Sequence, residues 1–369
     1  MLEPNSPKST KRSRRRILIF GCGYLGRVIG QNLQNEEDEV WGSTRSKENL
    51  HELQNLGIKP IVADWTDSRT LSELQTFTHV IIAVSRGRNS TLSYWDTLVG
   101  GLNNLLPRLS PTAHLTYVSS TGVYHQKNAL WVDETSPTFP TRPSAQAHLA
   151  AECLIRRTLT KQSWAILRLA GIYGPKRIPN CNQLLHQVPI HTDPNTYLNL
   201  IHVEDAVQAV LGAMERSDQA TYVVSDDRPT RRGDYYSYVA KLLRAPEPVF
   251  HPIVTDETPR LRSEGNKRIW NRKMKRMLVP ELPTSITWVG GFNPRRPAPS
   301  IVNRPDCGSV ISTPISRNAD SVASASSPSR KPLTVVRPSA IDPSMMARCD
   351  IDLSPGTRMR PVNEPPGSR

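Results

Sequence analysis

The 369-residue sequence has few aromatic residues and no long apolar run. Aromatic residues make up 6% and hydrophobic residues 37% of the chain, which is low for a protein that folds throughout its length. No stretch reaches the roughly eighteen apolar residues that a transmembrane helix needs. The apolar run Ile17–Phe20 after the basic N-terminus is too short for the core of a signal peptide. We therefore expect a cytoplasmic protein with no membrane span, part of which stays unfolded.

Cysteine and metal-binding motifs are absent as well. The five cysteines form no Cys-x-x-Cys pair, and no His-Glu-x-x-His motif or Cys/His cluster occurs. Cysteines spaced so widely do not describe a disulfide framework or a zinc site. We expect reduced thiols, no metal ion and no thiol-based catalysis.

The net charge of +14 belongs mostly to the two ends of the chain. Residues 1–16 contribute +5 and residues 293–369 another +5, which leaves +4 for the middle of the sequence. Neither end places aromatic residues between its basic ones, as single-stranded nucleic-acid sites do. The charge is therefore interpreted as solvated, and binding to nucleic acid is not indicated.

The composition changes abruptly at Asn293. The last 77 residues contain 13 prolines and 13 serines but no tryptophan, tyrosine, phenylalanine or histidine. Such a segment cannot bury enough apolar surface to offset its chain entropy. We predict a disordered basic N-terminus over 1–15, a folded unit over 16–292 and a disordered Pro/Ser-rich tail over 293–369.

Within the folded unit, short apolar segments alternate with segments of helical period. The predicted strands are Arg16–Phe20, Glu39–Ser43, Lys59–Ala63, His79–Val84, His114–Ser119 and Trp164–Leu169. The predicted helices run to about Asn35 after the first strand, over Lys47–Leu56, from Ser93 to Leu109 and from Ser144 to Lys161. This alternation predicts an α/β fold with a doubly wound parallel sheet of the Rossmann type, whose ligand lies at the carboxyl ends of the strands.

A glycine-rich turn follows the first strand. Gly21, Gly23 and Gly26 form Gly-x-Gly-x-x-Gly between a predicted strand and a predicted helix. The first glycine permits the tight turn, the second lets a pyrophosphate approach the backbone, and the third allows close helix–strand packing. The amides at the helix start, including those of Tyr24 and Leu25, would bind the phosphates. The turn therefore predicts a dinucleotide site.

The end of the second predicted strand favours NADP over NAD. The sequence there is Ser-Thr-Arg-Ser-Lys, without the carboxylate that would hold the ribose 2′-hydroxyl of NAD. Arg45 and Ser46 would instead bind a 2′-phosphate, although Arg45 also suits the start of an exposed helix. Asp64, after the third strand, is a candidate for the adenine amino group or a simple turn residue. NAD binding stays possible.

Four further segments follow the turn in order: TYVSSTGVY (116–124), VDETSP (132–137), LRLAGIYGP (167–175) and NLIHVEDAVQAV (199–210). Together with the turn they resemble the extended short-chain dehydrogenase/reductase superfamily, also called the NAD-dependent epimerase/dehydratase family. The resemblance covers about residues 16–292. It implies a Rossmann domain followed by a small C-terminal substrate lobe, formed mainly after residue 175, and it gives the basic segment 265–278 a structural role in that lobe.

The resemblance also assigns roles to individual residues. Ser120 matches the catalytic serine or threonine of the family, and Tyr124 matches the tyrosine of its Val-Tyr-Gly motif. The backbone from Leu169 to Ile172 would lie beside the nicotinamide. His202 begins the segment that matches the family's His-Val-x-Asp motif at the base of the substrate lobe.

Two departures from the family pattern bear on chemistry. Phe20 stands at the first glycine of the usual Gly-x-x-Gly-x-x-Gly, and Ser144 and His148 stand where the family has its Tyr-x-x-x-Lys pair. In the family, the tyrosine transfers a proton and the lysine lowers its pKa. Ser144 and His148 share a helix face and form a candidate replacement pair, although such residues are more often surface or packing residues. Tyr124 is the alternative proton donor.

Two function classes follow. The first is an NAD(P)-dependent oxidoreductase or epimerase/dehydratase-like enzyme that acts on a small substrate, with sugar-linked and nucleotide-linked molecules among the candidates. The second is a non-catalytic NADP(H) sensor or scaffold, which the missing Tyr-x-x-x-Lys pair favours. The substrate, the reaction direction and the oligomeric state are left open by the sequence.

Overall fold

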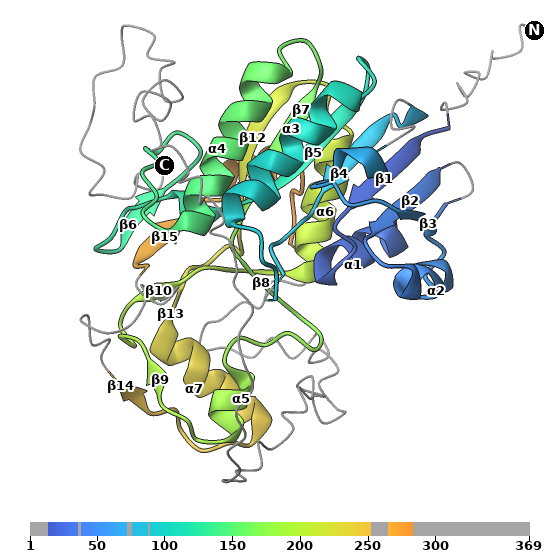
Figure 1. The fold of residues 1–369 in the computed structure, drawn as a ribbon. Helices are drawn as coiled ribbons and strands as arrows, with labels where there is room; N and C mark the ends of the chain where they lie inside the picture. Colours follow the sequence, from blue (N-terminus) through green and yellow to red (C-terminus); the bar gives the residue numbers. More distant parts are fainter. Residues whose placement is uncertain (1–13, 36–37, 72–75, 88, 252–264, 283–369) are drawn as a thin grey trace, which may run out of the picture.

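A seven-stranded parallel sheet forms the centre of the protein (Figure 1). The computed structural model describes residues 14–35, 38–71, 76–87, 89–251 and 265–282, and the predicted tail and N-terminal arm lie outside these ranges apart from Arg14 and Arg15. The strand order is β12-β7-β5-β4-β1-β2-β3, which confirms the predicted doubly wound sheet. The strands are β1 (Arg16–Phe20), β2 (Glu39–Thr44), β3 (Lys59–Val62), β4 (His79–Ile82), β5 (His114–Ser120), β7 (Trp164–Leu169) and β12 (Gln219–Val224).

Both faces of the sheet are buried, which explains why β1 and β4 are apolar after their first residue. Along β1, Ile17 and Ile19 pack into one core cluster, whereas Leu18 and Phe20 pack into another. Successive side chains of a strand point to opposite faces, so a run of apolar residues serves two helical layers. The first layer contains α1 (Tyr24–Asn32), α2 (Leu50–Asn55) and α6 (Val203–Met214); the second contains α3 (Gly101–Leu105) and α4 (Pro143–Thr158) (Figure 1).

Two predicted helices differ in detail from those observed. The Lys47–Leu56 helix begins with a 3₁₀ turn over Lys47–Asn49, and the Ser93–Leu109 helix contains a π-helical turn over Asp96–Gly100 before α3. A Cβ on Gly101 would lie 2.5 Å from the Trp65 ring, so only glycine lets the helix approach that ring. This close contact directly follows the widened turn.

Helix α4 ends at Thr158, three residues before the predicted end. The carbonyl of the next residue, Leu159, accepts hydrogen bonds from the indole nitrogen of Trp164 (3.2 Å) and the side-chain amide of Gln219 (2.9 Å). These two side chains satisfy the carbonyl of Leu159, which has no partner within the helix. The backbone of Leu159 is not helical. The end of this helix thus contacts β7 and β12.

A second, smaller core lies below the carboxyl ends of the strands (Figure 1). Residues such as Tyr173, Leu184, Ile190 and Tyr235 form it. Its elements are β8 (Gly171–Tyr173), α5 (Cys181–Leu185), β9 (Ile190–His191), β10 (Tyr197–Leu198), β11 (Leu200–His202), β13 (Thr230–Arg231), α7 (Arg232–Leu243) and β14 (Phe250–His251). The chain then returns to the sheet domain, where β15 (Lys267–Ile269) pairs with β6 (Leu130–Val132) before α8 (Arg272–Met277).

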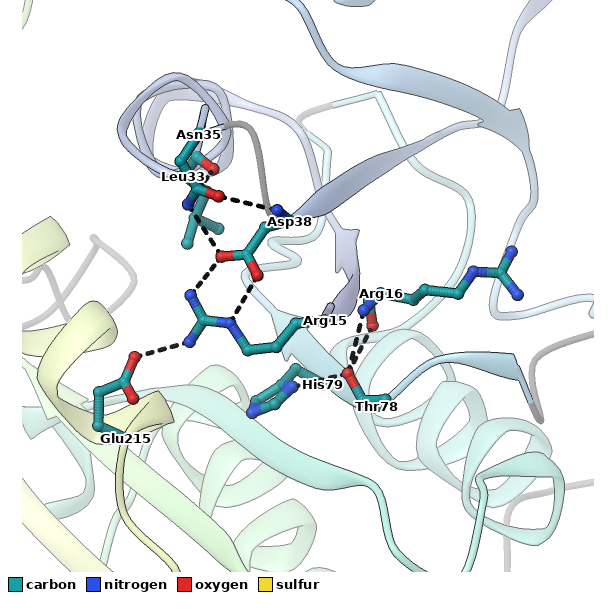
Figure 2. A network of polar contacts seen from close by, with 8 residues as sticks. All are labelled: Arg15, Arg16, Leu33, Asn35, Asp38, Thr78, His79 and Glu215. Carbon is teal, nitrogen blue, oxygen red and sulfur yellow. Dashed lines mark hydrogen bonds and ion pairs between the residues drawn. The ribbon is translucent and has the colours of Figure 1, made fainter. Parts of the chain in front are cut away.

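The amino ends of the strands are closed by a polar network around Arg15 (Figure 2). The Arg15 guanidinium makes an ion pair with Asp38 before β2 and another with Glu215 after α6 (2.6 Å). Burial opposes ionisation of Asp38, but the bonds from Arg15 and Asn35 lower the pKa of its carboxyl to about 2. The network lies at the edge opposite the expected ligand site, so it joins elements rather than serving a ligand.

Two expectations from the composition can be compared with the described residues. No helix in the described ranges is long and apolar enough to cross a membrane, and these ranges hold no cluster of metal-binding side chains. Cys22 and Cys181 are free thiols, as the sequence predicts for these two positions.

Candidate cofactor and active site

The turn after β1 has a geometry that only glycine permits at two of its positions. Gly21 has φ +89°, and a Cβ there would lie 2.6 Å from the carbonyl oxygen of Ala83 at the end of β4. A Cβ on Gly26 would collide with the carbonyl oxygen of Gly21. These contacts pack the first turn of α1 tightly against β1 and β4.

Gly23 lies at the open side of the same turn. A Cβ on this glycine would meet nothing within 4 Å, and Gly23 is the N-cap of α1, whose first turn holds no acidic residue. The turn lies between β1 and β4, where the strand order reverses, which is the ligand position in a doubly wound sheet. Room at Gly23 and unpaired amides at the helix start fit the pyrophosphate of a dinucleotide.

Tyr24 and Leu25 follow Gly23 at the start of α1. The Leu25 side chain is buried, so only its backbone can face a ligand. The Tyr24 hydroxyl donates a hydrogen bond to the carbonyl of Pro175 (2.9 Å), and the Arg177 guanidinium lies 5.1 Å from the centre of its ring. The side chain of Tyr24 therefore joins the glycine-rich turn to the loop that follows β8.

Arg45 follows β2 and is exposed. Its Nη2 atom lies 3.8 Å from the position that a Cβ would occupy on Gly87, in the loop after β4. The guanidinium thus extends across the carboxyl ends of the strands, where a ribose of a bound dinucleotide would lie.

Ser46 and Asp64 are held by local contacts. The amide of Ser46 donates to the Thr44 hydroxyl (3.3 Å), and a bond from the Ser46 side chain lowers the pKa of Glu48. Oδ1 of Asp64 accepts from the amide (2.9 Å) and the hydroxyl (2.6 Å) of Thr66. The turn interpretation of Asp64 therefore has direct support, and a contact with adenine stays a prediction.

Ser120 ends β5 beside the last residue of β7. The register places Ser120 opposite Leu169, whose side chain is buried. The Ser120 hydroxyl accepts a hydrogen bond from the Gly122 amide (3.0 Å), because Ser120 caps the 3₁₀ turn Thr121–Val123. Ile172 follows in β8 and is half-buried. Ser120 and the Leu169–Ile172 segment, which the sequence assigns to the same region, are thus neighbours at the strand ends.

Tyr124 lies in the interior, with 3% of its surface exposed. Its phenol oxygen accepts a hydrogen bond from Nη1 of Arg168 (2.9 Å). Burial raises the pKa of Tyr124 above its ordinary value, more than the neighbouring Arg168 lowers it. A buried phenol with a raised pKa is a weak acid near neutral pH, so the geometry favours a positioning role for Tyr124.

The partner of Arg168 is Glu152, a residue that sequence reasoning did not single out for function. Glu152 is fully buried in α4 and lies 2.7 Å from Nη2 of Arg168, and the Ser119 hydroxyl also donates to it (2.6 Å). Burial opposes ionisation, but the Arg168 charge keeps the pKa of Glu152 below its ordinary value. This ion pair ties α4 to β5 and β7 directly beneath the Ser120 turn.

Ser144 and His148 lie on the first two turns of α4, and both are half-buried. Nδ1 of His148 is 3.0 Å from the Tyr117 hydroxyl on β5, and the two rings pack at 6.1 Å. His148 is therefore hydrogen-bonded to Tyr117, and the Ser144–His148 pair stays a prediction.

His202 caps the helix that follows β11. Its Nδ1 accepts a hydrogen bond from the Glu204 amide (3.3 Å), so it ends the strand and begins α6. Asp226 lies nearby, almost fully buried. Burial and the charge of Asp205 raise its pKa to about 8, against a hydrogen bond from Tyr173. These residues form the base of the second lobe, as the resemblance implies for His202.

The family model for NAD dependent epimerases and dehydratases matches residues 17–225. This match spans more than half of the chain and includes the glycine-rich turn, β5 and α4. The chain belongs to this family. Membership and the open turn at Gly23 together support binding of a nicotinamide dinucleotide.

Solved structures of three proteins illustrate the likeness. A functionally unknown conserved protein from Silicibacter pomeroyi is 27% identical, with TM-score 0.61, over 74% of this chain and 95% of the other. A putative NAD-dependent epimerase/dehydratase from Methylobacillus flagellatus is 28% identical, with TM-score 0.55, over 72% and 92%. UDP-glucuronic acid 4-epimerase from Bacillus cereus, solved with UDP-glucuronic acid and NAD, shares the fold at 18% identity and TM-score 0.58, over 71% and 92%. No curated protein matches the chain.

Proposed function

We propose that the protein is an NADP(H)-dependent oxidoreductase or epimerase/dehydratase-like enzyme that acts on a small molecule. The observation that carries this proposal is the placement of Ser120 beside Leu169, at the same edge of the sheet as the open glycine turn. Family membership supports the reaction class, and the Bacillus cereus neighbour with bound NAD supports a nicotinamide dinucleotide as the cofactor.

The chain's own residues would hold the cofactor at defined points. The amides after Gly23 would bind the pyrophosphate, and Arg45 would pair with a 2′-phosphate through its two-pronged guanidinium. When bound, the nicotinamide would supply hydride transfer. The exposed arginine and the absence of a carboxylate after β2 support NADP over NAD.

Ser120 would orient the substrate oxygen that changes its protonation during the reaction. A serine hydroxyl is a poor acid near neutral pH, so proton transfer needs another group. His148 is the titratable side chain at the position of the family lysine, one helical turn after Ser144. The bond from Tyr117 orients its ring, and we propose that Ser144 and His148 relay the proton between substrate and solvent.

A non-catalytic NADP(H) sensor is the second candidate. The observation that favours it is the bond between His148 and the buried Tyr117, since it gives the imidazole a packing role at the position of the family lysine. A neutral imidazole cannot supply the positive charge that a lysine would.

One experiment separates the two functions. The purified full chain is titrated with NADPH and NADH by calorimetry, and hydride transfer is then followed at 340 nm (the absorbance of the reduced nicotinamide) with a panel of carbonyl and sugar-nucleotide substrates. Tight NADPH binding with turnover of any substrate supports the enzyme. Tight binding without turnover across the panel supports the sensor, and absence of binding to either dinucleotide contradicts both.

A further inference from the structure

Three cationic side chains converge beside the Ser120 turn. Lys267 comes from β15, Arg142 directly precedes α4, and Arg232 is the first residue of α7. We call these three residues the basic cluster. A Cβ on Gly122 would lie 3.3 Å from Nη2 of Arg142 and 3.2 Å from Oγ of Ser120, so both groups border the same glycine.

Lys267 links the cluster to the same turn. Its ammonium donates a hydrogen bond to the carbonyl of Tyr124 (3.2 Å), four residues after Ser120. Burial, together with the charges of Arg142 and Arg232, lowers the pKa of Lys267 to about 8. The ammonium therefore faces two like charges in a partly desolvated place.

Arg232 is almost fully buried, and its resolved hydrogen bonds go to neutral oxygens. Nε donates to the Thr196 hydroxyl (3.0 Å) and Nη2 to the carbonyl of Gly265 (3.2 Å). Burial lowers its pKa, while Tyr236 and the charge of Asp193 act in the opposite direction. Like charges brought together out of water are costly unless an anion compensates them.

The other buried arginines of the described chain show the contrast. Arg15 is 8% exposed and pairs with Asp38, and Arg168 is 4% exposed and pairs with Glu152. Arg232, at 6% exposed, forms no ion pair with a carboxylate among the described residues. Of these three buried guanidinium groups, only that of Arg232 has no carboxylate partner among the described residues.

We propose that the basic cluster binds an oxyanion of the substrate, a carboxylate or a phosphate monoester, next to the carbon–oxygen bond that Ser120 contacts. The group is separate from the pyrophosphate of the dinucleotide, which the Gly23 turn would hold. That the molecule with the oxyanion is a substrate rests on the proposed function. The oxyanion site itself rests on the basic cluster. The substrate class is thus a small anionic molecule rather than a neutral sugar or alcohol.

Sulfate is a suitable probe because it does not titrate between pH 6 and 9. The full chain, saturated with NADP and in a parallel series without it, is titrated with sulfate by calorimetry at fixed ionic strength. Sulfate should bind at one site below pH 8 and lose affinity as pH rises through about 8, because Lys267 then loses its proton. Lys267→Arg, which keeps its charge, should abolish this pH dependence while retaining binding.

A matched pair of variants tests the location. Lys267→Met should weaken sulfate binding by about tenfold or more, since a charge-assisted bond is lost. Lys273→Met is the control, because Lys273 also donates to a backbone carbonyl, that of Thr221 (2.9 Å), outside the cluster. Equal effects of the two substitutions, or no saturable sulfate binding by the parent chain, would overturn the proposal.

Methyl phosphate and acetate distinguish the two sources of the oxyanion. Tighter binding of methyl phosphate identifies a phosphate monoester, and tighter binding of acetate identifies a carboxylate; failure of both to compete with sulfate contradicts a substrate oxyanion. The NADPH titration is kept separate. Sulfate binding without NADPH binding would overturn the proposed function alone, and NADPH binding without sulfate binding would overturn the oxyanion site alone.

Discussion

The hydroxyl of Tyr117 and Nδ1 of His148 lie 3.0 Å apart, across the contact between β5 and α4. Burial raises the pKa of Tyr117 well above its ordinary value, so the phenol keeps its proton and can donate a hydrogen bond to Nδ1. The ring proton of a neutral His148 would then sit on Nε2. This bond orients the imidazole, and in the proposed relay the Tyr117 hydroxyl would change from donor to acceptor when His148 takes up a proton on Nδ1.

Ser120→Ala should lower turnover by about 10²-fold or more, because the substrate oxygen loses its hydrogen-bond donor in the transition state. Affinity for NADPH should not change. Steady-state kinetics and calorimetry measure the two quantities. Ser110→Ala, in an exposed turn before β5, is the control and should leave both unchanged. Undiminished turnover in a combined Ser120→Ala, Tyr124→Phe and His148→Ala variant would show that the active site lies elsewhere.

Arg45→Asp should reverse the preference between the two dinucleotides. In the parent chain we expect NADPH to bind more tightly than NADH by about 1–3 kcal/mol, the contribution of one charge-assisted pair. The new carboxylate would repel the 2′-phosphate and accept a bond from a 2′-hydroxyl. Calorimetric titration with both dinucleotides measures the change.

Arg157→Asp provides the matched control for Arg45→Asp. Arg157 is exposed in the last turn of α4, at the other edge of the sheet, and the substitution changes the net charge equally. Equal affinities for the two dinucleotides in the parent chain, unchanged by Arg45→Asp, would contradict the role of Arg45.

Glu152→Ala should destabilise the fold by about 3–5 kcal/mol, because the buried Arg168 would lose its counter-charge. Urea unfolding followed by circular dichroism measures the free energy of unfolding. Glu52→Ala is the comparison: Glu52 pairs with Arg27 at the surface, where an ion pair contributes at most about 1 kcal/mol. Similar losses in the free energy of unfolding for the two variants would mean that the buried ion pair contributes no more to stability than the surface pair does.

The raised pKa of Asp226 predicts a pH dependence of stability. Its carboxyl holds a proton in the folded chain up to about pH 8, whereas in the unfolded chain it ionises near its ordinary value of 3.8. The unfolded state therefore binds fewer protons between these values, so this group makes the free energy of unfolding fall as pH rises from about 4 to 8.

Asp226→Asn should reduce that slope and stabilise the chain at pH 8, as measured by urea unfolding at several pH values. Asp234→Asn is the control, since Asp234 is exposed in the first turn of α7. A slope that Asp226→Asn leaves unchanged would show that the buried carboxyl is not the group responsible.

The strands and the glycine turn could be predicted from the sequence. A strand buried on both faces must be apolar throughout, and Ile17–Phe20 followed by Gly21 carries that signal within a few residues. The positions of Ser120 and Leu169 also followed, because parallel strands bring their carboxyl ends to one edge. The end of α4 was predicted three residues too late, and the side chains of Trp164 and Gln219 bond to the carbonyl just after it, a contact that local periodicity does not reveal.

The basic cluster could not be predicted from the sequence. Arg142 and Lys267 are 125 positions apart, and the return of β15 to pair with β6 brings them together. Lys267 lies in a segment whose basic residues resemble an ordinary solvated face, and no local pattern distinguishes it. Local periodicity and turn chemistry therefore determined the sheet and the cofactor turn. Only the tertiary structure decided which cations lie close together, because like-charge proximity arises from contacts between distant segments.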